Sequence, residues 1–176
     1  MLKQVQHDKK MKVEILNTQQ IQQKLNRLAY EIYEHTLEEK EVMLAGIEGN
    51  GYLVAKKLSA LLKKISGQEV LLGKITLDKK NPLAAVPKID FEEKDYKNKV
   101  VIVVDDVLNS GKTLIYAVQL FLNQPVKKLH TVVLVDRSHT RYPAKADFVG
   151  LSLSTTLQEH IIADLSLSGK ETVYLE

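Results

Sequence analysis

The chain has 176 residues, of which 44% are hydrophobic and 27% charged, the balance of a globular domain with a core of its own. It contains no cysteine, which excludes disulfide bonds and thiolate zinc sites. The formal net charge of +3 is too small to indicate nucleic-acid binding by itself, and it leaves room for a small anionic ligand held at a helix N-terminus.

The hydropathy of the chain and its N-terminus bear on where the protein works. No apolar run reaches the roughly 20 residues that a membrane helix needs, and the charged N-terminus lacks the apolar segment of a signal peptide. We therefore expect a cytoplasmic protein with no membrane partner. Residues 1–11 are predicted to form a mobile polar tail, and residues 12–176 a single domain.

Hydrophobic periodicity predicts an alternation of helices and strands. Helices are indicated where apolar residues recur at spacings of three and four, and buried strands where apolar residues follow one another without interruption. Residues 78–98 are polar with little periodicity and predict a long loop, which in a compact domain is usually functional or disordered. In chain order, the predicted elements are a helix from Thr18 that Asn17 or Thr18 caps, a strand over 42–47, a helix over 53–62, a strand over 69–77, a strand over 100–104, a helix over 112–123 and a strand over 129–136.

This alternation predicts an α/β domain with a mostly parallel sheet. The last stretch, residues 160–176, differs because two strand-like segments are joined by a turn at Ser168-Gly169-Lys170. We expect it to form an antiparallel hairpin at one edge of the sheet.

The stretch VVIVVDDVLNSGKTL, residues 100–114, carries the most specific chemical pattern. Its end is similar to a nucleotide-binding P-loop, but that loop needs a glycine five positions before Gly111, and this position is Asp106. A carboxylate there would repel a triphosphate and would lack the backbone freedom of glycine, so the P-loop interpretation fails. What remains is an apolar strand that delivers Asp105 and Asp106, followed by a short turn and a helix.

The turn from Asn109 to Thr113 exposes backbone N–H groups at a helix N-terminus, where a monophosphate binds, and the hydroxyls of Ser110 and Thr113 are further donors. The two carboxylates precede this turn, away from the phosphate, where they can accept hydrogen bonds from sugar hydroxyls. A ligand with hydroxyls at one end and a phosphate at the other is a ribose 5-phosphate unit. The pattern therefore predicts a ribose 5-phosphate site.

The stretch VIVVDDVLNSGKT resembles the phosphoribosyl-pyrophosphate signature of type I phosphoribosyltransferases: four apolar residues, two acidic residues and a small-residue turn ending in Gly-x-Thr. From about residue 15 to the end, LNRLAYEIYE, MLAGIEGNGYLVAKKLSALL and VVLVDRSHTRYPAKADFVG follow the pattern of the pyrimidine-operon attenuator / uracil phosphoribosyltransferase family. The run Asp136-Arg137-Ser138-His139, followed by Pro143 and Ala146-Asp147, favours this branch over purine-specific relatives. The resemblance implies a mostly parallel twisted sheet flanked by helices, with a small hood and the C-terminal hairpin.

The resemblance also implies a reaction and its site. Ribose 5-phosphate would move from phosphoribosyl pyrophosphate to a nucleobase, most closely uracil, with release of pyrophosphate and with Mg²⁺ as cofactor. Asp105 and Asp106 would hold the ribose hydroxyls, directly or through the metal, and the loop 78–98 would close over the site as a lid. The other implied contacts are Asn109, Ser110, Gly111, Lys112 and Thr113 with the 5-phosphate, Glu48, Gly49, Asn50 and Gly51 with pyrophosphate, and Asp136, Arg137 and the stretches 136–142 and 152–156 with the base.

Two segments depart from the family pattern. The pyrophosphate turn usually carries a basic residue, and here it reads Glu-Gly-Asn-Gly. The lid usually carries a Tyr-Arg-Asp-like run, and here residues 77–82 read Leu-Asp-Lys-Lys-Asn-Pro. Lys79 and Lys80 either replace the missing cation, without the two-pronged donor geometry of arginine, or form an ordinary solvated pair. These departures bear on catalytic efficiency more than on ligand binding.

Regulatory members of the family bind messenger RNA through a basic dimer surface on the first helix. Arg27 matches a basic residue of that surface, but Glu31, Glu34, Glu38 and Glu39 are predicted beside it, and carboxylates repel phosphate. RNA binding is therefore disfavoured, while a homo-oligomer is expected from the family. Two functions remain open: a nucleobase phosphoribosyltransferase, or a sensor of phosphoribosyl pyrophosphate or nucleotide that regulates pyrimidine genes through RNA with weak or no catalysis.

Overall fold

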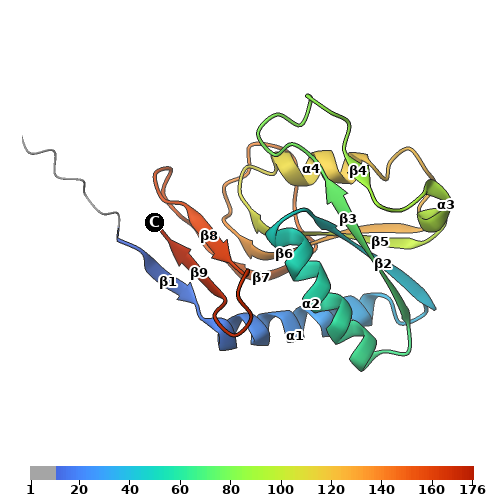
Figure 1. Cartoon of the computed structure of the whole chain (residues 1–176), viewed down its shortest axis with the longest axis horizontal. Helices are drawn as coiled ribbons and strands as arrows, with labels where there is room; N and C mark the ends of the chain where they lie inside the picture. The colour runs from blue at the N-terminus through green and yellow to red at the C-terminus, as the bar shows by residue number, and fades with distance from the viewer. Residues whose placement is uncertain (1–10) are drawn as a thin grey trace, which may run out of the picture.

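The computed structural model describes residues 11–176, so the predicted mobile tail lies outside the described residues except for the exposed Met11 (Figure 1). The described chain forms a six-stranded sheet, order β4-β3-β2-β5-β6-β7, and a three-stranded sheet, order β1-β9-β8. The elements are β1 (Val13–Leu16), α1 (Thr18–His35), β2 (Glu41–Ile47), α2 (Asn50–Ile65), β3 (Glu69–Thr76), β4 (Lys88–Ile89), α3 (Glu93–Tyr96), β5 (Val100–Leu108), α4 (Lys112–Gln119), β6 (Lys128–Asp136), β7 (Phe148–Ser152), β8 (Ile161–Asp164) and β9 (Thr172–Leu175).

The six-stranded sheet is parallel except at β4, which pairs antiparallel with β3 at one edge. Helices α1 and α2 cover one face, and α4 covers the other (Figure 1). Covering both faces explains why the central strands are continuous apolar runs and not alternating ones. The predicted α/β class with a mostly parallel sheet is confirmed.

Successive side chains of a strand point to opposite faces, so each central strand contributes to two apolar clusters. Val100, Ile102 and Val104 of β5 pack in the cluster that includes α1 and α2, and Val101 and Val103 pack in the cluster that includes α4. Helix α1 begins where Asn17 accepts a hydrogen bond from the backbone N–H of Gln20, whose side chain accepts one from Asn17 in return. Its buried face is formed by Ile21, Leu25, Leu28, Ala29 and Ile32.

The C-terminal hairpin is confirmed as an antiparallel pair, β8 with β9, but its predicted position at an edge of the main sheet is wrong. Instead β1 pairs with β9, and the three strands form a separate small sheet (Figure 1). We call this sheet the hood. Lys57 of α2 pairs with the buried Glu171 at 2.6 Å, and the Thr18 hydroxyl donates to the Glu171 carbonyl oxygen at 2.9 Å, so both flanking helices anchor the hood.

Several predicted boundaries differ from the observed ones. Strand β5 continues four residues past 104, so both aspartates lie inside it, and α4 ends at Gln119 before a series of turns. The long loop 78–98 contains the short elements β4 and α3. Helix α1 ends at His35, so Glu38 and Glu39 lie beyond it.

Besides β4, two strands have no counterpart among the predicted elements. β1 is only four residues long, and its outer end is exposed, so its apolar pattern is weak. β7 is interrupted by Gly150, where a Cβ atom would lie 2.4 Å from the carbonyl oxygen of Leu134 on β6. Glycine breaks the strand signal in the sequence, yet it is what permits this close backbone approach. Among residues 11–176, no helix is both long and apolar enough to span a membrane.

The packing of α1 on the sheet predicts a specific loss of stability. Ile32 is fully buried, at 0% exposure, so Ile32→Ala is expected to lower the free energy of unfolding by about 2–5 kcal/mol, because apolar contacts are lost and a cavity remains. Urea denaturation followed by circular dichroism measures this loss. The control Glu34→Ala, on the exposed side of the same helix, should change stability by less than about 0.5 kcal/mol. An equally small loss for Ile32→Ala would contradict the packing.

Candidate functional site

Two aspartates lie in the C-terminal half of β5. Asp105 has a side chain that is only 6% exposed, and its Oδ1 accepts a hydrogen bond from the Asp106 backbone N–H at 3.0 Å. Lys79 Nζ, from the loop after β3, lies 3.9 Å from the same oxygen. On the other side α2 packs closely, since a Cβ at Gly51 would lie 2.9 Å from Oδ1. The strand therefore presents a buried carboxylate whose nearest cation belongs to the predicted lid.

Burial, and after it the charge of Asp106, raises the pKa of the Asp105 carboxyl well above its ordinary value, while Lys79 acts in the opposite direction. A bound cation would relieve this repulsion. Among residues 11–176, no cluster of three or more His, Asp or Glu side chains could enclose a metal ion. Asp105 and Asp106 line one cavity, and two carboxylates fit Mg²⁺, which is commonly held by one or two carboxylates together with substrate phosphates and water.

The turn after β5, predicted to bind the 5-phosphate, is held by a left-handed glycine and by local hydrogen bonds. Gly111, with φ at 81°, ends the turn and precedes α4, and the Lys112 N–H donates to the Ser110 hydroxyl at 3.3 Å. The backbone N–H groups of Arg141 and Tyr142 donate to the Ser110 carbonyl at 2.8 and 3.0 Å and hold the turn from behind. A cavity of about 50 Å³ lies on this turn, lined by Asp105, Val107, Leu108, Asn109, Ser110, Gly111, Thr113 and Leu114.

A larger cavity of about 250 Å³ also includes the aspartates and brings together elements that are far apart in the sequence. It is lined by Asn50, Lys79, Asp105, Asp106, Val107, Asn109, Thr113, Ile161, Ile162 and Ala163. Six of these ten residues were predicted as site residues. The contribution of β8 was missed, because its three apolar side chains carry no polar signal and the hairpin was expected at a sheet edge.

The predicted pyrophosphate turn carries no free cationic side chain. Glu48 lies 3.6 Å from Lys74 of β3, and Gly49, with φ at 92°, precedes α2 without a side-chain cap. The Asn50 side chain is engaged elsewhere, because its Nδ2 donates to the carbonyl oxygen of Ala163 at 2.7 Å. Backbone N–H groups at the start of α2 are therefore the donors that this turn has for an anion.

The structure separates the two lysines of the lid. Lys79 reaches Asp105, whereas Lys80 contributes its carbonyl oxygen, which accepts from Lys112 Nζ at 3.3 Å. Asp78 fixes this turn, since its Oδ1 accepts from the N–H groups of Lys80 and Asn81 at 2.9 and 3.0 Å, and these bonds lower its pKa. Lys79 is the one of the two that lines the cavity.

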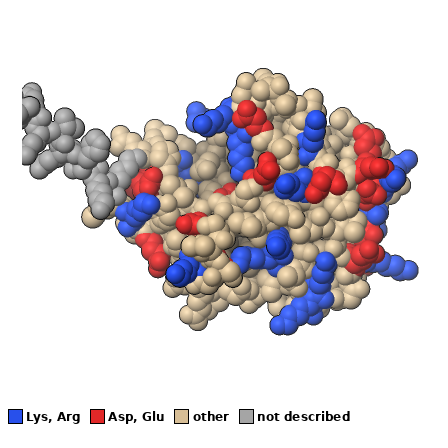
Figure 2. Space-filling view, in the orientation of Figure 1, with Lys and Arg blue, Asp and Glu red and all other residues tan. Residues whose placement is uncertain are grey.

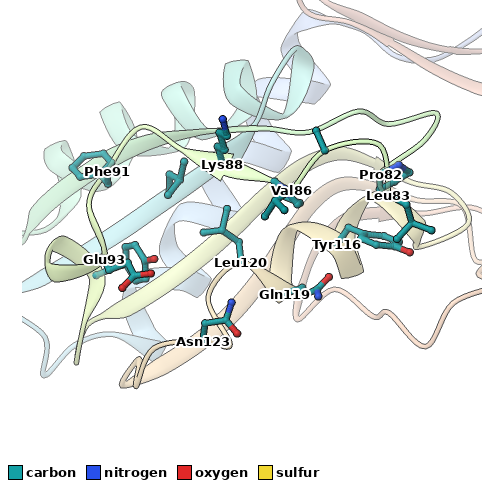
Figure 3. A pocket seen from close by; sticks show the side chains of 14 residues that line it. Pro82, Leu83, Val86, Lys88, Phe91, Glu93, Tyr116, Gln119, Leu120 and Asn123 are labelled. Atoms are coloured by element: carbon teal, nitrogen blue, oxygen red, sulfur yellow. The ribbon is translucent and has the colours of Figure 1, made fainter.

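The second half of the loop does not cover this cavity. Residues 82–91 face α4 and the turns that follow it, across a groove of about 460 Å³ (Figure 3). Val86, Leu120 and Tyr116 point into the space between them, and Leu83 and Val86 are 80% and 81% exposed (Figure 3). Of residues 78–98, Lys79 lines the cavity of the aspartates, and closure of the loop as a lid stays a prediction.

The predicted base-contacting pair lies outside both cavities of the aspartates. Arg137 is buried, with Nε donating to the Thr155 hydroxyl at 2.5 Å and a terminal nitrogen to the Thr156 carbonyl at 2.8 Å. The Asp136 carbonyl accepts from the Leu153 N–H at 2.8 Å. This pair therefore ties the two segments predicted for the base pocket, 136–142 and 152–156, to each other.

The side chain of Arg27 also makes its contacts within the chain. Its guanidinium pairs with Glu31 and donates to the carbonyl oxygens of Val149 and Gly150 on β7 at 2.9 and 2.7 Å. Figure 2 shows acidic and basic side chains mixed over the upper and right parts of the face in view, and basic side chains over α2. The contacts of Arg27 within the chain reduce its availability for RNA phosphates.

Residues 12–168 match the phosphoribosyl transferase domain family, and the chain belongs to this family. Among its relatives, the bifunctional protein PyrR of Clostridium acetobutylicum is 34% identical over 86% of this chain and 89% of the relative. The bifunctional protein PyrR of Alkaliphilus metalliredigens is 33% identical over 92% and 93%. The resemblance to the pyrimidine-operon branch, drawn from the sequence, is confirmed.

Solved structures confirm the type I phosphoribosyltransferase fold. Hypoxanthine phosphoribosyltransferase of Trypanosoma cruzi superimposes with a TM-score of 0.74 at 15% identity, over 92% of this chain and 94% of that one. A hypoxanthine-guanine phosphoribosyltransferase of Bacillus anthracis gives 0.72 at 20% identity, over 92% and 95%.

The raised pKa of Asp105 predicts how stability depends on pH. A carboxyl whose pKa is higher in the folded than in the unfolded state binds its proton more tightly when folded, so stability falls as pH rises from the unfolded value through the folded one. Asp105→Asn keeps an oxygen that can accept from the Asp106 N–H. Without metal at pH 7, it is expected to raise the melting temperature by about a few degrees.

This gain should shrink as the pH falls toward about 4, where the unfolded carboxyl is also protonated. Calorimetry at several pH values measures it, with the exposed Glu34→Gln as control. A destabilised Asp105→Asn at neutral pH would mean that Lys79 outweighs burial.

Proposed function

We propose that this protein transfers ribose 5-phosphate from phosphoribosyl pyrophosphate to uracil and releases pyrophosphate. The observation that carries the proposal is the cavity in which the buried Asp105, its neighbour Asp106 and Lys79 meet Asn109 and Thr113 of the turn after β5. The choice of uracil rests on the PyrR relatives and on the resemblance of the segment 136–147 to that branch.

In this reaction a ring nitrogen of the base attacks C1 of the ribose. The bond from C1 to the pyrophosphate oxygen breaks, its electrons leave with pyrophosphate, and the nitrogen loses its proton. Asp105 and Asp106 would accept hydrogen bonds from the ribose hydroxyls and face the positive charge that develops at C1. The turn Asn109–Thr113 would hold the 5-phosphate through backbone N–H groups and hydroxyls, which fixes C1 for attack.

Lys79 would neutralise negative charge on the leaving pyrophosphate, because it lines the cavity and the turn at Glu48–Gly51 supplies no side-chain cation. Asp105 and Asp106 would hold Mg²⁺, which would supply further neutralisation of the pyrophosphate charge when bound. We expect the protein to act as a homo-oligomer, as the family resemblance implies, and to work in the cytoplasm, as expected from its hydropathy and N-terminus.

The direct test is pyrophosphate release with phosphoribosyl pyrophosphate and Mg²⁺, offering uracil, adenine, guanine, hypoxanthine and xanthine in parallel. We expect turnover with uracil and its loss in the double variant Asp105→Asn/Asp106→Asn. Turnover with a purine alone would contradict the substrate, and turnover that survives the double variant would contradict the site.

The distinct positions of the two lid lysines give a sharper prediction. Lys79→Met is expected to lower kcat/KM by roughly 10²-fold or more, because it removes the cation next to the leaving group. Lys80→Met should lose far less, since the contact of Lys80 in this structure is made by its carbonyl oxygen, which the variant keeps. Steady-state kinetics of both variants measures the difference, and equal losses would argue against a specific role for Lys79.

A second function, sensing phosphoribosyl pyrophosphate or nucleotide to regulate pyrimidine genes through RNA, is favoured by a pyrophosphate turn without a cationic side chain and by relatives named bifunctional. It predicts saturable nucleotide binding with little turnover, and RNA affinity that falls steeply with salt. The engagement of Arg27 within the chain weighs against the RNA part. Filter binding with a pyrimidine-leader RNA between low and high salt distinguishes the two.

A further inference from the structure

One hydrogen bond connects the predicted pyrophosphate turn to the hood. Asn50, the first residue of α2, donates from Nδ2 to the carbonyl oxygen of Ala163 on β8 at 2.7 Å, across 113 residues of sequence. Both residues line the cavity that holds Asp105 and Asp106. This bond therefore spans the cavity wall, from the helix beside the carboxylates to the strand that faces them.

The pairing of β8 explains why this carbonyl is free to accept. His160 and Glu176 exchange both backbone hydrogen bonds at the end of the hairpin. Because such pairs alternate along antiparallel strands, Ile162 and Asp164 bond to β9, whereas Ile161 and Ala163 turn their backbone groups away from it. β8 is the outer strand of the hood, so these groups face outward from the small sheet. Asn50 engages one of them, and the other edge residue, Ile161, lines the same cavity.

Close packing of α2 against the main sheet fixes the position of Asn50. Gly51 lets the start of α2 press against the end of β5, where a side chain would lie 3.0 Å from the Val104 carbonyl as well as against Asp105. Gly46 likewise admits α2 at the end of β2, because a Cβ there would lie 2.7 Å from the Ala55 Cβ. A closely packed helix start thus carries the amide that contacts β8.

We propose that Asn50 is a positioning residue that clamps the hood to the cavity, so that the wall formed by Ile161–Ala163 stays at the distance a nucleotide requires. The inference rests on the proposed function in taking the cavity as a nucleotide site. The side-chain amide of Asn50 bonds to the protein's own backbone and not to pyrophosphate. Where the family pattern has a basic residue that contacts the ligand, this turn has a residue that holds the cavity wall in place.

The experiment compares the full chain with Asn50→Ala, Asn50→Gln and Thr18→Val. Thr18→Val is the matched control, because it also removes one side-chain donor to a hood carbonyl, that of Glu171, outside the cavity. Hydrogen exchange of the ligand-free protein is measured over β8, and calorimetry gives the affinities for uridine 5′-monophosphate and for magnesium pyrophosphate.

Asn50→Ala is expected to speed exchange at Ile162 and Asp164 and to weaken binding of the monophosphate by roughly three- to tenfold, because the Ala163 carbonyl loses its donor. Asn50→Gln, which keeps the amide, should recover much of that affinity. Thr18→Val should leave both affinities unchanged and speed exchange only near Glu171.

Unchanged exchange over β8 in Asn50→Ala would overturn the clamp, and so would a loss confined to pyrophosphate, which would assign the amide to the ligand. The exchange measurement needs no ligand or turnover. If the wild-type protein binds neither ligand, the proposed function fails, and exchange over β8 still decides the clamp.

Discussion

The burial of one carboxylate at the end of a fully covered strand is the constraint on which the site depends. Asp105 continues the apolar run of β5 into the interior, where its pKa rises and its charge needs a partner. Within the chain, its partners are the backbone N–H of Asp106 and the Nζ of Lys79, 3.9 Å away. A polar ligand in the cavity would be a third partner. A group held at such a cost in stability is typical of a binding or catalytic position.

The surrounding elements leave the Asp105 side chain only 6% exposed, where it lines the cavity. Gly51 allows α2 to pack against it, and Gly111, with its positive φ, ends the turn between β5 and α4. The hood forms the facing wall, held by Lys57 and Thr18 far from the cavity and by Asn50 inside it. The turn Glu48–Gly51 carries no basic residue. Among the described residues, Lys79 is the one cationic side chain that lines the cavity of the aspartates.

Much of the fold and of the candidate site could be predicted from the sequence, because the residues that indicate them lie close together in the chain. The run VIVVDDVLNSGKT joins strand, carboxylates and turn within thirteen consecutive residues, so its role did not depend on distant contacts. The position of the hood could not be predicted, since the pairing of β1 with β9 joins the two ends of the described chain. Asn50, Arg137 and one terminal nitrogen of Arg27 donate to backbone or hydroxyl groups more than ten residues away, and no sequence pattern marks such acceptors. Asp136 and Arg137, expected at the base, hold two segments together instead, outside both cavities of the aspartates.

The central claim is that the end of β5 and the turn after it form one ribose 5-phosphate site. A crystal structure with uridine 5′-monophosphate tests this most directly. The account predicts the phosphate against the backbone of Ser110–Thr113, the ribose hydroxyls within hydrogen-bonding distance of Asp105 or Asp106, and the base beside β8. A phosphate bound elsewhere, such as in the groove over α4, or a ribose turned away from both carboxylates, would contradict it.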